Sequence, residues 1–224
     1  MSQETVVLLH GILRSRTDML LLERALKKAG YLPINLRYPS RTMSLEDLTD
    51  FVAEAIENHE NYNPEQPVNF VTHSMGGLIT RYYLATHRPD NLGKVVMLSP
   101  PNTGSEFADF FDDHKIFGET FRKVFGPAGP QLRVTHEHIT GDIDYPLGII
   151  AGSASINPLA PWVLEGVHDG IVPVERTKID GMTDHIVLKA THSFMMFNPN
   201  VIRQVVEFLN NTKFDHGAPE ELPA

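Results

Sequence analysis

The sequence predicts an α/β fold in which a mostly parallel β-sheet carries helices on both faces. Short apolar runs typical of buried strands alternate along the chain with segments whose apolar residues recur at helical spacing. The connections between them are short, and such alternation is typical of parallel strands joined by helical crossovers. With 224 residues, 42% hydrophobic and 21% charged, the chain has the size and apolar content of one globular domain over residues 1–224.

The predicted elements follow one another in a regular order. The predicted strands are residues 6–12, 32–36, 68–73, 94–98, 145–151 and 184–190. The predicted helices are residues 17–29, 44–56, 75–86 and 198–209. Ser44 begins a capping-box-like segment, Gly30 is typical of a helix end, and Asn198-Pro199 is typical of a helix start. We expect the tail, residues 215–224, to be frayed.

The stretch around Ser74 has the pattern of a strand, a sharp turn and a helix. A serine at such a turn projects its hydroxyl above the sheet edge, and the N–H of the next residue points into the same space. The usual pattern is G-x-S-x-G, with small residues two before and two after the serine. Gly76 keeps the second small residue, whereas Thr72 departs from the first. Because a serine before Gly-Gly also occurs in ordinary turns and N-caps, the pattern alone leaves both interpretations open.

A second motif stands at the end of the first predicted strand, where the apolar run of residues 6–9 leads into His10-Gly11. Together with the turn at Ser74, this motif resembles the α/β-hydrolase family, specifically its small bacterial lipases and carboxylesterases, over nearly the whole chain. In that family the loop after His-Gly and the residue after the nucleophile supply the oxyanion donors. The resemblance therefore implies an oxyanion hole made by the N–H groups of Ile12 and Met75.

Two downstream loops extend the resemblance. His168-Asp169-Gly170 resembles the acid loop of the family, and Thr191-His192-Ser193 resembles its histidine loop. The chain order Ser, Asp, His also fits the family. The resemblance thus implies a catalytic set of Ser74, Asp169 and His192.

The residues themselves favour the same assignment, since a serine hydroxyl needs a base and the base needs an orienting carboxylate. His192 directly follows a predicted strand, and Asp169 lies in a short loop that could hold a carboxylate in place. A surface-loop role for His192 stays open. The rival bases are His136, His138, His168 and His185. The rival acids, which precede predicted strands and are also typical of solvated turns, are Asp142, Asp144 and Asp184.

The segment from Pro100 to about Tyr145 interrupts the alternation, and we interpret residues 102–144 as an insertion that forms a small helical cap or lid. Six of the chain's 12 phenylalanines lie there, at spacings that would form two aromatic helix faces. Ordinary core packing is the alternative interpretation of these faces. As a cap, the segment would bind an acyl chain, and the predicted substrate-binding residues are Phe107, Phe111, Phe117 and Phe121.

Composition excludes several other classes. The formal net charge is −9 and no Lys/Arg cluster is visible along the chain, so a nucleic-acid partner is not expected. Cysteine is absent, which excludes disulfides and thiolate metal sites. His136-Glu137-His138 offers zinc-type ligands, but at a spacing that suits neither one helical face nor a zinc finger, so we predict no metal.

Targeting signals are equally unsupported by the sequence. The N-terminus has no positive region before its short apolar run. The uncharged run 145–164 is interrupted by three prolines and two glycines, which argues against a membrane span. We therefore expect a cytoplasmic protein without a transmembrane segment.

The resemblance implies a serine hydrolase, a carboxylesterase or lipase, that cleaves small-molecule or lipid esters through an acyl-enzyme on Ser74 and needs no cofactor. A thioesterase or an acyltransferase would use the same residues. A non-catalytic binding member of the fold is a further alternative, for which the departure at Thr72 is the only sign. The sequence leaves the oligomeric state open.

Overall fold

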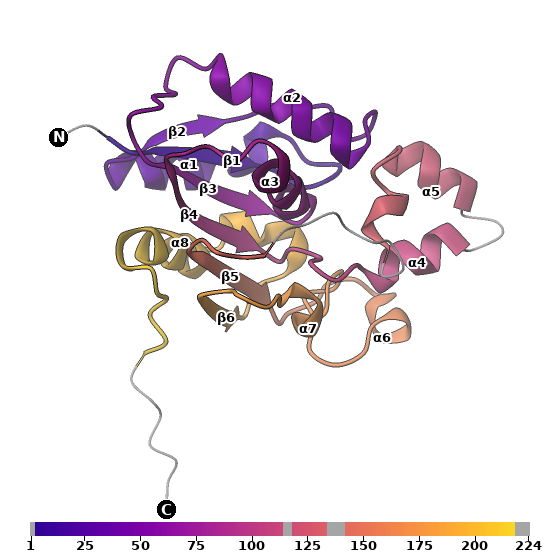
Figure 1. The fold of residues 1–224 in the computed structure, drawn as a ribbon. Coiled ribbons are helices and arrows are strands. Elements are labelled where there is room, and N and C mark those ends of the chain that lie inside the picture. The colour runs from indigo at the N-terminus through magenta and orange to yellow at the C-terminus, as the bar shows by residue number, and fades with distance from the viewer. Residues whose placement is uncertain (1–2, 114–117, 134–141, 218–224) are drawn as a thin grey trace, which may run out of the picture.

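The structure is a computed structural model that describes residues 3–113, 118–133 and 142–217. Its centre is a six-stranded sheet with the order β2-β1-β3-β4-β5-β6 (Figure 1). Every pairing between these strands is parallel. The strands are β1 (Thr5–Leu9), β2 (Leu32–Asn35), β3 (Val68–His73), β4 (Leu92–Leu98), β5 (Leu147–Gly152) and β6 (Asp184–Leu188). The predicted α/β fold with a parallel sheet is confirmed.

Four helices cover the two faces of the sheet (Figure 1). They are α1 (Leu20–Lys28), α2 (Leu45–Glu57), α3 (Met75–Thr86) and α8 (Pro199–Asn211). Successive side chains of β1 separate into two cores, because a strand directs them to opposite faces. Val7 and Leu9 pack in the cluster that contains α2 and α3. Val6 and Leu8 pack in the cluster that contains α1 and α8.

The helix starts follow the capping signals in the sequence. The Ser44 hydroxyl accepts a hydrogen bond from the N–H of Asp47 at 3.1 Å, and Asn198 caps α8. The predicted helix over residues 17–29 is instead divided into a 3-10 turn, η1 (Arg16–Met19), and α1. The side chain of Asp18 accepts from the N–H of Ser15 at 2.8 Å, which starts the helical turn earlier than the apolar spacing indicates.

Between β4 and β5 the described residues contain helices and no strand. These are α4 (Glu106–Asp113), α5 (Gly118–Phe125) and the 3-10 helix η2 (Pro130–Leu132). They lie beyond the carboxyl ends of the strands (Figure 1). Arg133, directly after η2, contacts the carboxylates of three residues of α4, at 3.0, 2.8 and 2.9 Å. The segment is also attached to the sheet domain, since Arg41 Nε donates to the carbonyl of Val124 at 2.7 Å.

The last third of the chain adds short helices around the same sheet edge. They are α6 (Ala160–Val163), α7 (Val174–Thr177) and the 3-10 helix η3 (His192–Phe197). The predicted frayed tail begins at Asp215, whose carboxylate lies 2.8 Å from Nη1 of Arg203. Residues 218–224 lie outside the described part of the chain.

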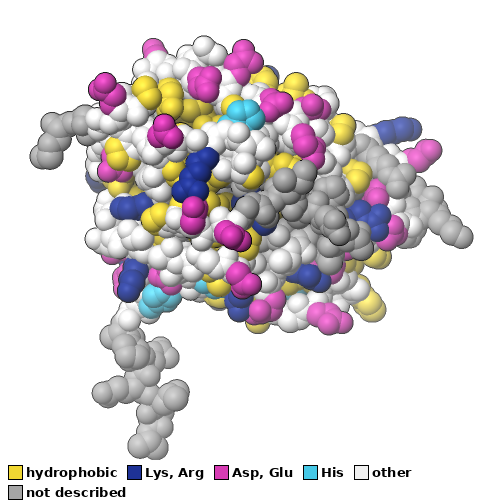
Figure 2. Space-filling view, viewed as in Figure 1, with side chains coloured by type: hydrophobic (Ala, Val, Ile, Leu, Met, Phe, Trp, Pro, Cys, Tyr) yellow, Lys and Arg dark blue, Asp and Glu magenta, His cyan; other side chains and the backbone are white. Residues whose placement is uncertain are grey.

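Acidic side chains are scattered over the face shown in Figure 2 rather than gathered in one patch. None of the helices that the structure describes is both long enough and apolar enough to cross a membrane.

The turn between β3 and α3 brings the helix backbone very close to β1. A Cβ at Gly76 would lie 2.6 Å from the carbonyl oxygen of Leu9, so only glycine fits there without a shift. Thr72, at the other small position of the pattern, is fully buried. Its Oγ1 has no hydrogen-bond partner among the described residues, and an unpaired buried hydroxyl reduces stability.

We predict opposite changes in stability for two small substitutions at this turn. Gly76→Ala should lower the free energy of unfolding by about 1–3 kcal/mol, because overlap with the Leu9 carbonyl outweighs the roughly 1 kcal/mol by which alanine favours a helix. Thr72→Val should raise it by about 1 kcal/mol by removing the unpaired hydroxyl. Urea denaturation of both variants and the wild type provides the measurement. A Gly76→Ala variant as stable as the wild type would contradict the close approach.

Candidate active site

The sheet topology determines where loops from distant parts of the chain meet. All strands are parallel, so their carboxyl ends lie along one edge. From β1 the chain runs first to β2 on one side, and later to β3 on the other side. The space between the ends of β1 and β3 is therefore a topological switch point, where open α/β sheets bind ligands. Gly11 and Ile12 follow β1, and Ser74 follows β3, so both loops border this point.

Ser74 has an unusual backbone conformation. Its φ and ψ are 53° and −123°, a region that residues other than glycine rarely occupy. It sits between β3 and the first turn of α3, as the sequence pattern predicts. Gly11 packs directly against it, since a Cβ on Gly11 would lie 3.1 Å from the Ser74 Cβ. The strained turn is thus held between its own helix and the loop after β1.

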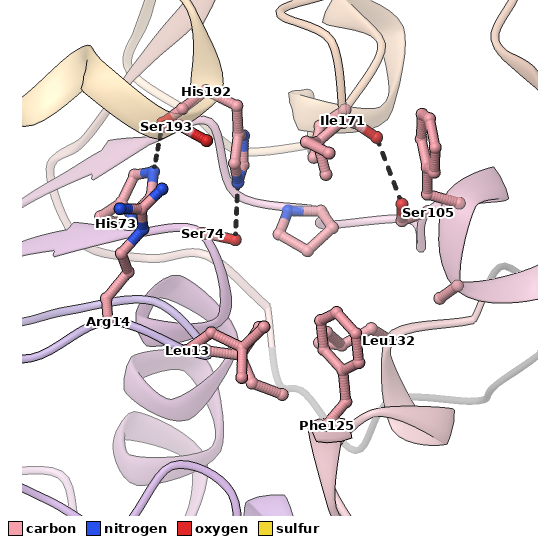
Figure 3. Close-up of a pocket in the computed structure, with 15 residues that line it drawn as sticks. Leu13, Arg14, His73, Ser74, Ser105, Phe125, Leu132, Ile171, His192 and Ser193 are labelled. Carbon is pink, nitrogen blue, oxygen red and sulfur yellow. Dashed lines mark hydrogen bonds between the residues drawn. The ribbon is translucent and has the colours of Figure 1, made fainter. Parts of the chain in front are cut away.

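The structure brings Ser74, His192 and Asp169 together in one chain of hydrogen bonds. His192 Nε2 lies 3.0 Å from Ser74 Oγ, and His192 Nδ1 lies 2.7 Å from Asp169 Oδ2. Figure 3 shows the contact between His192 and Ser74 at the wall of a pocket. The exposed fractions of these three residues are 7%, 8% and 2%. Residues 118 and 23 positions apart in sequence therefore meet in a nearly buried site.

Asp169 is held as a charged acceptor. Its Oδ1 accepts from the N–H groups of Ile171 at 3.0 Å and Val172 at 2.8 Å. Burial acts to raise the pKa of this carboxyl, but the charge of His192 and the hydrogen bonds from His192, Val172 and Ile171 lower it below its ordinary value. A carboxylate at this position requires a proton on Nδ1 of His192. The neutral ring then has a free Nε2 that accepts from the Ser74 hydroxyl.

Backbone contacts fix the two loops that carry the acid and the base. The N–H of His192 donates to the carbonyl of Asp169 at 3.0 Å. Gly170, next to the acid, has a φ of +100°, which favours glycine. Gly152, at the end of β5, leaves the space that Asp169 occupies, since a Cβ there would lie 2.7 Å from the Asp169 Cβ.

His73 connects the Ser74 turn to the His192 loop. Its Nε2 lies 3.0 Å from the carbonyl of His192 and donates to it. Burial holds the pKa of His73 well below its ordinary value, and the neighbouring charge of His192 lowers it further. His73 is therefore neutral and serves as a buried link between the two loops.

The N–H groups of Ile12 and Met75 are free to bind a ligand atom. Within the described residues, neither group donates to another protein atom. Met75 is the first residue of α3, where an N–H has no partner inside the helix. Ile12 lines the pocket beside Ser74.

A cavity of about 430 Å³ opens beside Ser74 and His192. Most of its lining is apolar and comes from the loops after β1 and β4, from α4, α5 and η2, and from the loop before α7. The apolar lining residues are Ile12, Leu13, Pro101, Phe107, Ala108, Phe125, Leu132, Ile171 and Val172. In Figure 3, Phe125 and Leu132 lie on the opposite side of the cavity from His192.

Of the four phenylalanines predicted to bind substrate, Phe107 lines the cavity. Phe117 lies outside the described residues. Phe111 and Phe121 lie in α4 and α5, with side chains outside the described part of the structure. Phe125, in the same predicted aromatic face as Phe117 and Phe121, lines the cavity although it was not among the predicted contact residues. Leu132 and Ile171 carried no sequence signal, because their approach to Ser74 depends on tertiary folding.

The rival candidates have other environments. Asp144 lies 2.6 Å from Arg88, and Asp184 accepts from the N–H of Phe214 at 2.8 Å. His185 contacts the hydroxyl of Thr177 at 3.0 Å. Two other rivals, Asp142 and His168, have no contact with Ser74 in the described structure. The last two, His136 and His138, lie outside the described residues.

The described residues contain no group of three His, Asp or Glu side chains that could hold a metal ion. His136, Glu137 and His138, the only candidate segment for zinc in the sequence, lie outside these residues.

Known proteins resemble this chain at the level of the fold. A protein-family model described as alpha/beta hydrolase fold matches residues 4–133, more than half of the chain. Bacillus licheniformis lipase BlEst2 in its mature form superposes with a TM-score of 0.73 and 18% identity, over 93% of this chain and 92% of that chain. Phospholipase PlaB from Legionella pneumophila gives 0.71 and 16%, over 95% of this chain and 60% of its own.

A metagenomic carboxyl esterase, MGS0156, gives a TM-score of 0.67 and 16% identity, over 86% of this chain and 65% of that chain. At such low identities these structures share the architecture of the chain. Together with the match to the family model, they show that this chain belongs to the α/β-hydrolase fold family.

Proposed function

We propose that the protein is a carboxylic-ester hydrolase that forms an acyl-enzyme on Ser74. The observation that carries this proposal is the hydrogen-bonded chain from Ser74 through His192 to Asp169 at the wall of an apolar cavity. The three structural neighbours are named a lipase, a phospholipase and a carboxyl esterase, and these names agree with the proposed class.

The reaction begins when His192 Nε2 takes the proton of the Ser74 hydroxyl and Oγ attacks the ester carbonyl carbon. Asp169 stabilises the imidazolium that forms and keeps its ring oriented. The tetrahedral intermediate then expels the alcohol, which receives the proton from Nε2. A water molecule, activated in the same way, attacks the acyl-enzyme and releases the carboxylic acid and free Ser74.

In this mechanism the developing oxyanion binds to the N–H groups of Ile12 and Met75. Both are free of protein partners within the described structure, and both border the turn at Ser74. Loss of one such donor typically costs about 2.7–4 kcal/mol of transition-state stabilisation.

The acyl chain would occupy the apolar cavity. We propose that residues 102–144 act as a cap over it, because Phe107 and Phe125 from this segment line the cavity. The inner side of the segment also packs on the sheet domain through Ala108, Ala128 and Leu132, which belong to the larger core cluster. The proposed cap role is therefore compatible with core packing by the same segment.

Two alternatives remain within the fold. A thioesterase or acyltransferase would use the same three side chains and would differ only in leaving group or acceptor. A non-catalytic binding protein would retain the cavity and lack turnover. The hydrogen bond between Asp169 and His192 favours a catalytic role, because a structural serine has no need of an oriented base.

Ser74→Ala should reduce ester hydrolysis by a factor on the order of 10⁶, to near the uncatalysed rate, because the attacking oxygen is lost. The measurement is turnover of p-nitrophenyl esters, with fluorophosphonate labelling and peptide mass mapping. Ser193→Ala provides the matched control, since Ser193 also lines the cavity but has no contact with His192 Nε2. Phosphonate labelling of any other serine would refute the assignment.

Asp169→Asn should preserve the fold and lower kcat by about 10⁴, because the amide favours the wrong histidine tautomer. Asp144→Asn and Asp184→Asn serve as controls, as these carboxylates bind Arg88 and the N–H of Phe214 instead. Steady-state kinetics and circular dichroism of the three variants make the comparison. Equal losses at Asp169 and at either control would leave the acid unassigned.

The cavity should favour longer acyl chains, with kcat/KM rising from acetyl to hexanoyl esters by about fourfold per buried methylene. Phe125→Ala should flatten this rise, because it removes part of the apolar wall. Trp162→Ala is the matched control, since the Trp162 side chain is 88% exposed and does not line the cavity. A wild-type preference for acetyl esters would argue against an acyl site here.

A further inference from the structure

A second groove adjoins the apolar cavity at Arg14, which lines both. It has a volume of about 530 Å³ and lies between the loop after β1 and the loop after β2. Three arginines, Arg14, Arg37 and Arg41, line it together with hydroxyl groups of neighbouring residues. No Asp or Glu is among its lining residues. We call this feature the arginine groove, defined by Arg14, Arg37 and Arg41.

Such a concentration of positive charge is unexpected in a chain with a formal net charge of −9. The three arginines come from two loops, so no basic run is visible in the sequence. The strands β1 and β2 are neighbours in the sheet, and their parallel pairing brings these loops together. The guanidinium groups add up to a local positive field that favours an anionic ligand.

The arginines retain capacity to bind a ligand. Arg37 is exposed and, within the described part of the chain, forms no ion pair. Arg41 donates from Nε to the carbonyl of Val124, which leaves its terminal nitrogens without a partner in the described structure. Only Arg14 has an acidic neighbour, with 3.6 Å between its Nη1 and Oδ1 of Asp18. At this distance the contact is a weak, partly solvated ion pair.

The floor of the groove is rigid. His10 and Tyr38 are both buried and stack with 4.1 Å between ring centroids and 3° between ring planes. The Tyr38 hydroxyl donates to the carbonyl of His10. Burial lowers the pKa of His10 below its ordinary value, so its ring adds no positive charge near neutral pH. The charge of the groove therefore comes from the arginines.

Arg14 connects the groove to the proposed reaction site, because it lines both the groove and the apolar cavity. In Figure 3 it extends on the side of the cavity away from Ser105, next to His73. A ligand whose carbonyl carbon sits at Ser74 can thus place its acyl chain in the cavity and its other end in the groove. The two ends meet surfaces of opposite character, one apolar and one cationic.

We propose that the arginine groove binds the phosphate of a phosphorylated acyl substrate, carried on the alcohol or thiol part that leaves during hydrolysis. This inference rests on the proposed function of Ser74. Guanidinium groups match the geometry of phosphate oxygens, and several of them can bind one phosphate or diphosphate at once. Hydrolysis consumes one water and yields the carboxylic acid and the phosphorylated alcohol or thiol, so no further reactant is needed.

The test compares pairs of substrates that share the reacting acyl bond, one member of each pair with phosphate and one without. One pair is butyryl-coenzyme A and S-butyryl-N-acetylcysteamine, which share the thioester. The other is 1-acyl-glycerol-3-phosphate and the matching 1-monoacylglycerol, which share the glycerol ester. For at least one pair, kcat/KM of the wild type should favour the phosphorylated member by about tenfold or more, mainly through KM. Preference in the first pair indicates a nucleotide-type phosphate, and preference in the second indicates a lipid phosphate.

Arg37→Gln and Arg41→Gln should each reduce this preference several-fold, and the double variant should nearly abolish it. Arg24→Gln is the matched control, because Arg24 is exposed on α1 and does not line the groove. Raising NaCl from about 20 to about 500 mM should also reduce the preference, since exposed charge pairs are screened. A ratio near one in both pairs, or equal losses in Arg24→Gln and the double variant, would overturn the proposal.

A binding measurement separates this inference from the hydrolase mechanism. Inorganic pyrophosphate should raise the Tm of the Ser74→Ala protein, and the Arg37→Gln/Arg41→Gln changes should remove that shift. This shift, together with a wild-type protein that hydrolyses none of the esters or thioesters, would refute the proposed function and leave the groove intact as an anion site. Esterase activity on neutral esters without any shift or phosphate preference would refute the groove alone.

Discussion

The close approach of the α3 backbone to β1 is the contact on which the site depends. Gly76 lies so near the Leu9 carbonyl that a single Cβ would overlap with it. Ser74, two residues before Gly76, has the strained backbone conformation of this turn. Gly11 then packs on Ser74 from the loop after β1. The position of Ser74 and of the free N–H of Met75 therefore depends on close backbone packing at this turn.

The second requirement is a set of polar groups that remain satisfied while nearly buried. His192 bridges Ser74 and Asp169, and each oxygen of the Asp169 carboxylate has at least one donor. These donors keep the carboxylate charged despite burial, which is why its pKa falls instead of rising. His73 holds the His192 loop through a backbone carbonyl without adding a second charge. The loops after β3, β5 and β6 are thus combined into one rigid site.

Local sequence signals predicted the elements and the residues that stand at their ends. The strand runs, the cap at Ser44 and the turn at Ser74 depend on neighbours within a few positions, and the structure has each of them. The cavity wall could be predicted only in part. Phe107 belonged to a visible aromatic face, whereas Leu132 and Ile171 reach the cavity through contacts between distant segments. The arginine groove left no trace in the sequence, because Arg14 and Arg37 become neighbours only through the pairing of β1 with β2.

The order of the strands also explains how the two ends of a ligand could bind to surfaces of different character. On one side of Ser74, the segment after β4 supplies apolar side chains, which bind by exclusion of water and discriminate weakly between similar chains. In the adjoining groove, the loops after β1 and β2 supply guanidinium groups, which recognise charge and geometry. The two surfaces share the loop after β1, since Arg14 lines both, but most of their other lining residues come from different segments. Substrate selectivity in this architecture is therefore a property of the loops, while the chemistry depends on the shared sheet edge.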